Sequence, residues 1–128
     1  MYKRQKENRA AGHQSYSIYA AANGRRKPSV ELATGPSYTT QIGSRTVARS
    51  AWAHIAATYD GTAMRIYKNG VLIGRRALRG DLVGTPDPLK VGGSAVWSEF
   101  FKGRIDEVRV WNAARTAKQI RSDMKARI

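Results

Sequence analysis

The chain is 128 residues long, 41% hydrophobic and 9% aromatic, which is typical of one soluble globular domain with a single core. It contains no cysteine and two histidines, which excludes disulfides, thiolate zinc sites and histidine-rich metal centres. The formal net charge of +14 attracts polyanions, but the basic residues are spread along the chain, so a solvated basic surface is the simpler interpretation.

The first part of the chain predicts a hairpin after an unstructured start. Residues 1–13 show no periodic pattern and are predicted to be a disordered leader. No apolar segment follows these basic residues, so no signal peptide is expected in this chain. Apolar and polar side chains alternate over 14–20, which predicts a strand. Asn23 and Gly24 then predict a tight turn, because both residues tolerate positive φ, and 28–34 is the returning strand.

The middle of the chain predicts further antiparallel strands. Residues 37–50 are polar and ambiguous, a weak strand beside a loop, whereas 51–61 is a strand that ends in a turn. Residues 63–78 are the clearest hairpin, with two strands joined by Asn69 and Gly70. Turn signals about every ten residues predict an all-β fold, an antiparallel β-sandwich or jelly roll. No stretch of about 18 apolar residues occurs, so no membrane insertion is expected.

The C-terminal part predicts one last strand and one short helix. Residues 103–112, GRIDEVRVWN, have the pattern of a strand that closes the sheet. Thr116 and Gln119 form a T-x-x-Q capping box, which predicts a helix over about 116–127. The apolar residues of this helix fall four apart and share one face.

Two adjacent acids, Asp106 and Glu107, raise the question of catalysis. Successive side chains of a strand point to opposite faces, so these two carboxylates cannot converge on one bond. A retaining glycosidase needs its two carboxyl groups about 5–5.5 Å apart on the same side of the substrate. We therefore predict that Glu107 pairs with Arg109 on one face, and that the chain is not an enzyme.

Three segments in order carry a family resemblance: WAHIAATYDG (52–61), MRIYKNGVLIG (64–74) and FKGRIDEVRVWNAARTAKQI (101–120). Together they resemble the laminin G-like, concanavalin A-like jelly-roll domain of bacterial extracellular proteins. Its pattern runs W-x-H-[IV]-A-x-T-Y-D-G, then Y-x-N-G, then G-x-I-D-E-[VF]-R-[IV]-[WY]-N-x-A-R-[ST]. YSIYAAANG (16–24) is similar to the strand upstream of these segments.

The resemblance implies a β-sandwich over 14–128. Family domains usually begin with one or two earlier strands that carry a glycine-rich segment and a tryptophan, so we expect a sandwich that is incomplete at its N-terminus, in a fragment of a longer protein. Inward side chains are expected from the matched strands. These are Trp52, Ile55, Ala57, Met64, Ile66, Leu72, Val108 and Val110.

Calcium is the metal that the resemblance implies, bound at a rim of the sandwich by carboxylates and backbone carbonyls. Asp106 is the best single candidate, because the start of its predicted strand places it near the rim. Asp60 matches the turn position of the motif, and it can instead cap the Asp-Gly turn through its own backbone. No acidic cluster of the D-x-D-x-D type occurs.

The resemblance also implies a non-catalytic module that binds carbohydrate or protein, within a larger secreted or cell-surface protein. Four aromatic side chains are the candidate ligand-binding residues: Tyr59, Tyr67, Trp97 and Trp111. Trp97 lies in a predicted loop and is the first to mutate. Trp111 has two interpretations, packing between sheet and helix or stacking on a sugar ring. His54 is interpreted as a structural hydrogen-bonding residue.

Two other functions are kept as alternatives. The first is an electrostatic binder of anionic polysaccharide, with nucleic acid the less favoured partner, if two hairpins bring their basic residues to one rim. The residues of this predicted rim are Arg25, Arg26, Lys27, Arg75, Arg76 and Arg79. The second is a glycan-cleaving enzyme of the same superfold, which typically carries an E-x-D-x-x-E row that this chain lacks.

Overall fold

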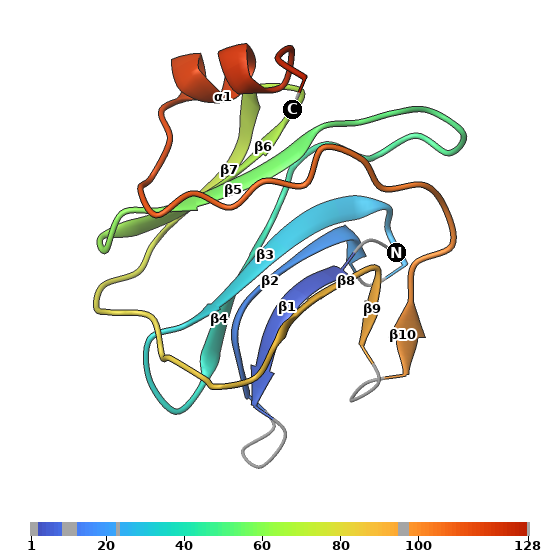
Figure 1. Ribbon diagram of the computed structural model, residues 1–128. Coiled ribbons are helices and arrows are strands. Elements are labelled where there is room, and N and C mark those ends of the chain that lie inside the picture. The colour runs from blue at the N-terminus through green and yellow to red at the C-terminus, as the bar shows by residue number, and fades with distance from the viewer. Residues whose placement is uncertain (1–2, 9–12, 23, 95–97, 128) are drawn as a thin grey trace.

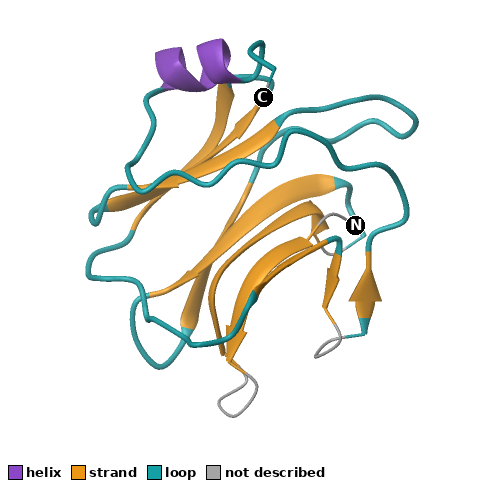
Figure 2. Cartoon of the chain, viewed as in Figure 1, coloured by secondary structure: helices purple, strands orange, loops and turns teal. Residues whose placement is uncertain are grey.

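The computed structural model describes the chain except for residues 1–2, 9–12, 23, 95–97 and 128. It is a layered β structure with one short helix (Figures 1 and 2). The elements are β1 (Lys3–Asn8), β2 (His13–Ala22), β3 (Lys27–Ala33), β4 (Tyr38–Ile42), β5 (Ile55–Tyr59), β6 (Ala63–Lys68), β7 (Val71–Ala77), β8 (Leu89–Val91), β9 (Gly93–Ser94), β10 (Glu99–Phe100) and α1 (Ala117–Asp123).

Two antiparallel sheets form the body of the domain, as the β-sandwich prediction requires. A five-stranded sheet has the order β4-β3-β2-β1-β8, and a three-stranded sheet has the order β5-β6-β7. β9 and β10 pair as a separate short ribbon. Figure 1 shows the two larger sheets facing each other, with α1 on the side of the three-stranded sheet that faces away from the five-stranded one.

β1 corrects the prediction of a disordered leader. Lys3–Asn8 pairs with β2 on one side and with β8 on the other, so it lies inside the five-stranded sheet. A polar sequence can form this strand because the hydrogen bonds between strands come from the main chain. An alternating apolar pattern identifies only strands that bury one face, so it does not detect a polar strand. The prediction of disorder over 1–13 is therefore wrong for the residues that the structure describes.

The tight turns follow the local sequence. Asn69 and Gly70 both have positive φ, 49° and 73°, and close the hairpin of β6 and β7 with Lys68 paired to Val71. This is the conformation that a two-residue Asn-Gly turn requires. Of the predicted earlier turn, Gly24 has φ 69°, and Asn23 lies outside the described residues.

The core lies where β3 crosses the three-stranded sheet. Its buried residues are Val30 and Leu32 of β3, Met64 and Ile66 of β6, and Ile73 of β7, each no more than 5% exposed. Burial was thus predicted correctly for Met64 and Ile66. Ile55 and Ala57, also expected to face inward, pack against this cluster while remaining half-buried.

Three of the expected inward residues face solvent instead. Trp52, Leu72 and Val110 are 67%, 47% and 60% exposed. For Leu72 the reason is a register shift, since Ile66 pairs with Gly74 but Tyr67 pairs with Leu72. The extra residue, Ile73, is a β-bulge and takes the inward position, because shifting a strand by one residue exchanges its two faces. Val108 is half-buried.

The predicted strand over 103–112 is wrong as a hydrogen-bonded element. This segment carries no ladder in the described chain, and Glu107 has φ 51°, which interrupts an extended strand. The helix is present but shorter than predicted, Ala117–Asp123 in place of 116–127. Its capping box is confirmed: Thr116 accepts from the Gln119 backbone, and the Gln119 side chain accepts from the Thr116 backbone.

Candidate functional site

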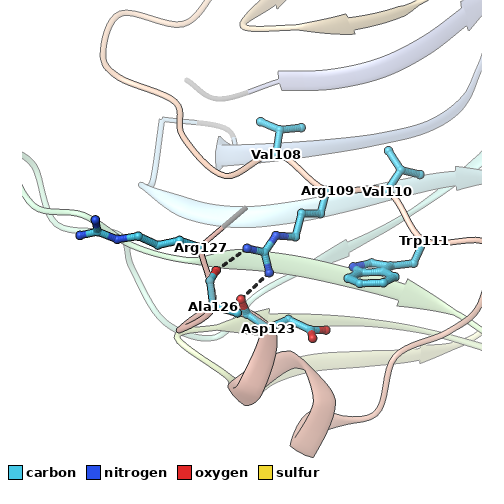
Figure 3. Close-up of a pocket in the computed structure, with 7 residues that line it drawn as sticks. All are labelled: Val108, Arg109, Val110, Trp111, Asp123, Ala126 and Arg127. Atoms are coloured by element: carbon cyan, nitrogen blue, oxygen red, sulfur yellow. Dashed lines mark hydrogen bonds between the residues drawn. The ribbon is translucent and has the colours of Figure 1, made fainter.

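An open groove of about 450 Å³ lies between the segment 108–111 and the C-terminal end of α1. Figure 3 shows how the segment alternates along it: Arg109 and Trp111 point toward the helix, and Val108 and Val110 point away. The period-two alternation expected for this segment is therefore present, although the sheet pairing is not. The groove is lined by Val108, Arg109, Val110, Trp111, Asp123, Ala126 and Arg127.

Arg109 joins the two walls of this groove. Its Nη1 donates to the Asp123 carbonyl at 2.5 Å, and its Nη2 donates to the Ala126 carbonyl (Figure 3). A cation at this position stabilises α1, because the last carbonyls of a helix lack intrahelical donors and carry a partial negative charge. Nη2 also bonds the Glu107 carboxylate at 2.8 Å, so the predicted pairing of Glu107 with Arg109 is confirmed.

Trp111 forms the aromatic wall of the groove. Its side chain is 49% exposed, and the Arg115 guanidinium lies 4.2 Å from the ring centroid. Arg115 in turn binds both carboxylate oxygens of Asp123, at 2.9 and 3.0 Å. These hydrogen bonds lower the pKa of Asp123, and the charges of Arg115 and Arg109 act in the same direction. The indole is thus held in place while about half of its surface faces solvent.

His54 lies next to this network and is half-buried. The pKa of His54 is lowered, mainly by burial and to a smaller extent by the charge of Arg109, and the charge of Asp123 opposes both effects. The backbone of His54 fastens the start of β5 to the β6–β7 turn: its N–H donates to Asn69 Oδ1 at 2.9 Å, and its carbonyl accepts from the Asn69 N–H at 2.8 Å. These are main-chain bonds, and Nδ1 of the imidazole is buried without a hydrogen-bond partner among the described residues, so a structural hydrogen-bonding role for the side chain stays a prediction.

The other predicted ligand-binding aromatics are placed differently. Tyr67 is 4% exposed, so its prediction as a ligand-binding residue is wrong. It follows Ile66 on β6 and faces the opposite side of the sheet, where α1 lies (Figure 1). Tyr59 packs against the core, and its hydroxyl donates to the Gly80 carbonyl at 2.5 Å. Burial and the nearby Asp81 and Asp60 raise the pKa of Tyr59. Trp97 lies outside the described residues.

The two predicted calcium ligands, Asp60 and Asp106, have separate hydrogen-bond partners. Asp60 Oδ1 accepts from Thr62 N–H, Thr62 Oγ1 and Ala63 N–H, and Oδ2 pairs with Arg65 at 2.6 Å. These bonds cap the Asp-Gly turn and lower the pKa of Asp60. Asp106 Oδ1 accepts from the Glu107 N–H. The described part of the chain holds no group of three His, Cys, Asp or Glu residues, so it does not fit a carboxylate-built Ca²⁺ site.

The predicted basic rim is divided between two ends of the molecule. Arg25 and Arg26 lie in the turn before β3, and Lys27 begins that strand. Arg79 precedes Gly80, which lies beside Thr34 just beyond the other end of β3. Arg76 donates to the Thr40 carbonyl on β4 at 2.9 Å. Because β3 is seven residues long, its two ends are about 20 Å apart.

Sequence reasoning missed Arg115, Arg127 and the helix end as parts of the groove. The signal for Arg115 was present, because the motif R-[IV]-[WY]-N-x-A-R places Arg109, Trp111 and Arg115 at fixed spacings. What connects the two arginines is Asp123, eight residues beyond Arg115: its carboxylate accepts from Arg115, and its main-chain carbonyl accepts from Arg109. Only the return of α1 over the sheet brings this group back to Trp111.

Comparison with known proteins identifies the family. A laminin G-like domain model, described as the concanavalin A-like lectin/glucanases superfamily, matches residues 3–121. Mouse pappalysin-1 is 38% identical over 81 residues, which is 59% of this chain and 5% of that protein. Human pappalysin-1 is 38% identical over 82 residues, 58% of this chain and 5% of that protein. The chain therefore spans about a twentieth of the length of these relatives.

Among solved structures, an S-layer domain-containing protein of Clostridium thermocellum (residues 221–444) aligns with a TM-score of 0.48 and 17% identity, over 84% of this chain and 54% of that one. Across the described residues, no helix has the length and apolar character needed to cross a bilayer. The match over 3–121 agrees with the motifs, the two facing sheets and the turn geometry. This chain belongs to the laminin G-like family of the concanavalin A-like lectin/glucanases superfamily.

Proposed function

We propose that this domain is a non-catalytic recognition module that binds a glycan outside the cell, as part of a larger protein, and that the groove beside α1 is its binding site. The observation that carries the proposal is Trp111, which is half-exposed in the groove and held by Arg115 at 4.2 Å. Binding sites combine an apolar or aromatic wall with a few fixed polar groups, and this groove has both.

The chemistry of the groove suits a sugar ring. An indole offers a flat apolar surface for the C–H face of a pyranose. Because Arg115 already holds the ring, less side-chain entropy is lost when a ligand binds. Arg127 is exposed at the same groove, and its side chain extends outward in Figure 3. Guanidinium N–H groups are donors only, so Arg127 suits the oxygen atoms of hydroxyl or carboxylate substituents.

The acidic residues near the groove support a binding role over hydrolysis. Glu107 is paired with Arg109 and Asp123 is paired with Arg115. Arg115 lowers the pKa of Asp123, which makes this carboxyl unsuited to the general acid that glycoside hydrolysis requires.

The test is a glycan-array screen followed by calorimetric titration with the strongest ligand, using the wild type and Trp111→Ala. We expect Trp111→Ala to weaken binding about tenfold or more, since an aromatic anchor is worth at least about 1.4 kcal/mol. Trp52→Ala is the matched control, because Trp52 is 67% exposed but does not line the groove, and it should bind like the wild type.

Other outcomes contradict the proposal. Unchanged binding in Trp111→Ala removes the groove as the site, and loss of binding in Trp97→Ala alone moves the site to Trp97. A wild-type domain that binds no glycan on the array rules out the glycan as the ligand.

A further inference from the structure

The end of the sandwich that carries the β2–β3 turn also carries the loop from β4 to β5 and the β6–β7 turn. Backbone hydrogen bonds hold these three segments together. The Val47 N–H donates to the Arg26 carbonyl at 2.7 Å, and the Gly43 N–H donates to the Pro28 carbonyl at 2.8 Å. The Ser44 N–H donates to the Ile73 carbonyl at 2.8 Å, which connects the loop to β7 as well.

The side chains that meet at this end are basic. Lys68 Nζ donates to the Thr46 carbonyl at 2.6 Å, which places a third cation-bearing segment against the loop. The segments 24–30, 43–50 and 66–74 contain no acidic residue, and they carry Arg25, Arg26, Lys27, Arg45, Arg49 and Lys68. We call these six residues the loop-end basic cluster. Arg25, Arg26, Arg45 and Arg49 are exposed.

This cluster differs from the rim that the sequence predicted. The turn residues Arg25 and Arg26 are joined to Arg45 and Lys68 through the loop, whereas Arg75, Arg76 and Arg79 lie toward the other end of β7. The loop is held by bonds to β3, β6 and β7, so its cations are presented by a fixed backbone. Like charges gathered on three segments that contain no acidic residue repel one another, and an anionic ligand relieves that repulsion.

We infer that the loop-end basic cluster is a second binding site, which takes an anionic polysaccharide. Carboxylate or sulfate groups along such a chain would pair with the exposed arginines, whose guanidinium forks match planar and tetrahedral oxyanions. A duplex nucleic acid is a poorer fit, because reading the major groove is the task of a projecting helix or β-ribbon, and the exposed arginines of this cluster lie in a tight turn and in the β4–β5 loop. The cluster shares no residue with the lining of the groove beside α1, so either proposal can fail alone.

The test compares two triple variants that remove the same charge. Arg25→Gln, Arg45→Gln and Arg49→Gln are combined in the loop-end variant, since all three are exposed. Arg75→Gln, Arg79→Gln and Arg104→Gln are combined in the control variant, which changes three exposed arginines elsewhere. Affinity for a fluorescent heparin octasaccharide is measured by anisotropy at several NaCl concentrations, with a 20-base-pair DNA as the second probe.

We expect the loop-end variant to bind the heparin probe about tenfold more weakly, as loss of three partly screened ion pairs implies, and the control variant to change it less than about threefold. The dependence of affinity on salt should also become shallower in the loop-end variant alone, because fewer counterions are released on binding. Thermal unfolding of both variants should match the wild type.

Equal weakening in both variants would show attraction by net charge alone, and it would overturn the site. Tighter binding of the DNA than of the heparin probe at the same salt, lost in the loop-end variant, would overturn the choice of ligand. A loop-end variant that keeps its affinity for the glycan of the Trp111 experiment separates this site from the groove.

Discussion

In the centre of the domain, Val30 of β3 and Met64 of β6 are 1% and 0% exposed, whereas Val110 and Trp111 of the C-terminal segment are 60% and 49% exposed. The central strands are paired by backbone ladders and buried against a second sheet. The C-terminal segment carries no ladder over 104–112, and it is held by the side chains of Arg109 and Arg115.

The difference separates two sources of stability. Apolar burial in the centre is worth roughly 25 cal/mol per Å² and acts on the whole fold. Exposed or half-exposed arginine contacts are individually weaker, and they control whether one segment stays docked. We therefore expect the groove proposed for the glycan to open locally while the sandwich remains folded.

The largest effect on stability is expected from a substitution in the buried core. Ile66→Ala removes a fully buried side chain, and we expect it to lower the free energy of unfolding by about 2–5 kcal/mol. Leu72→Ala is the control in the neighbouring strand, because Leu72 is 47% exposed and should lose less than about 1 kcal/mol. Urea denaturation measures both. Equal losses would contradict the bulge that turns Ile73 inward in place of Leu72.

A smaller effect, limited to α1 and the C-terminal segment, is expected from a substitution at Arg109. Arg109→Met keeps an apolar stem but removes the bonds to the Asp123 and Ala126 carbonyls and to Glu107. We expect amide protection in α1 to fall about tenfold, since each hydrogen bond to a charged group is worth about 1.5–3 kcal/mol before exposure reduces it. Protection in β3 and β6 should not change. A matching loss in β3 would show that the segment is part of the global fold.

The smallest effect is the pH dependence of the same segment. Hydrogen bonds from Arg115 lower the pKa of Asp123 in the folded chain, so ionised Asp123 stabilises the docked helix above the unfolded pKa of about 3.9. This contribution is lost as the pH falls below that value. Protection of α1, corrected for intrinsic exchange, should decline between about pH 4 and pH 2 in the wild type. In Asp123→Asn it should be lower at pH 6 and nearly flat, and an identical decline in both would exclude Asp123.

Local sequence chemistry determined several features without the fold. Asn69 and Gly70 form the predicted turn, Thr116 and Gln119 form the predicted cap, and Glu107 pairs with Arg109. Each of these depends on residues within three or so positions of one another, so propensity and spacing are sufficient to predict them. The three ordered motifs likewise identified the family that the match over 3–121 establishes.

Tertiary structure alone decided the rest. β1 is a strand because β2 and β8 offer backbone partners, and Tyr67 is buried on the side of its sheet where α1 lies. Arg25 and Arg26 join Arg45 and Lys68, not Arg79, because the β4–β5 loop is hydrogen-bonded to the turn before β3. These outcomes depend on segments far apart along the chain, whose contacts no local pattern records.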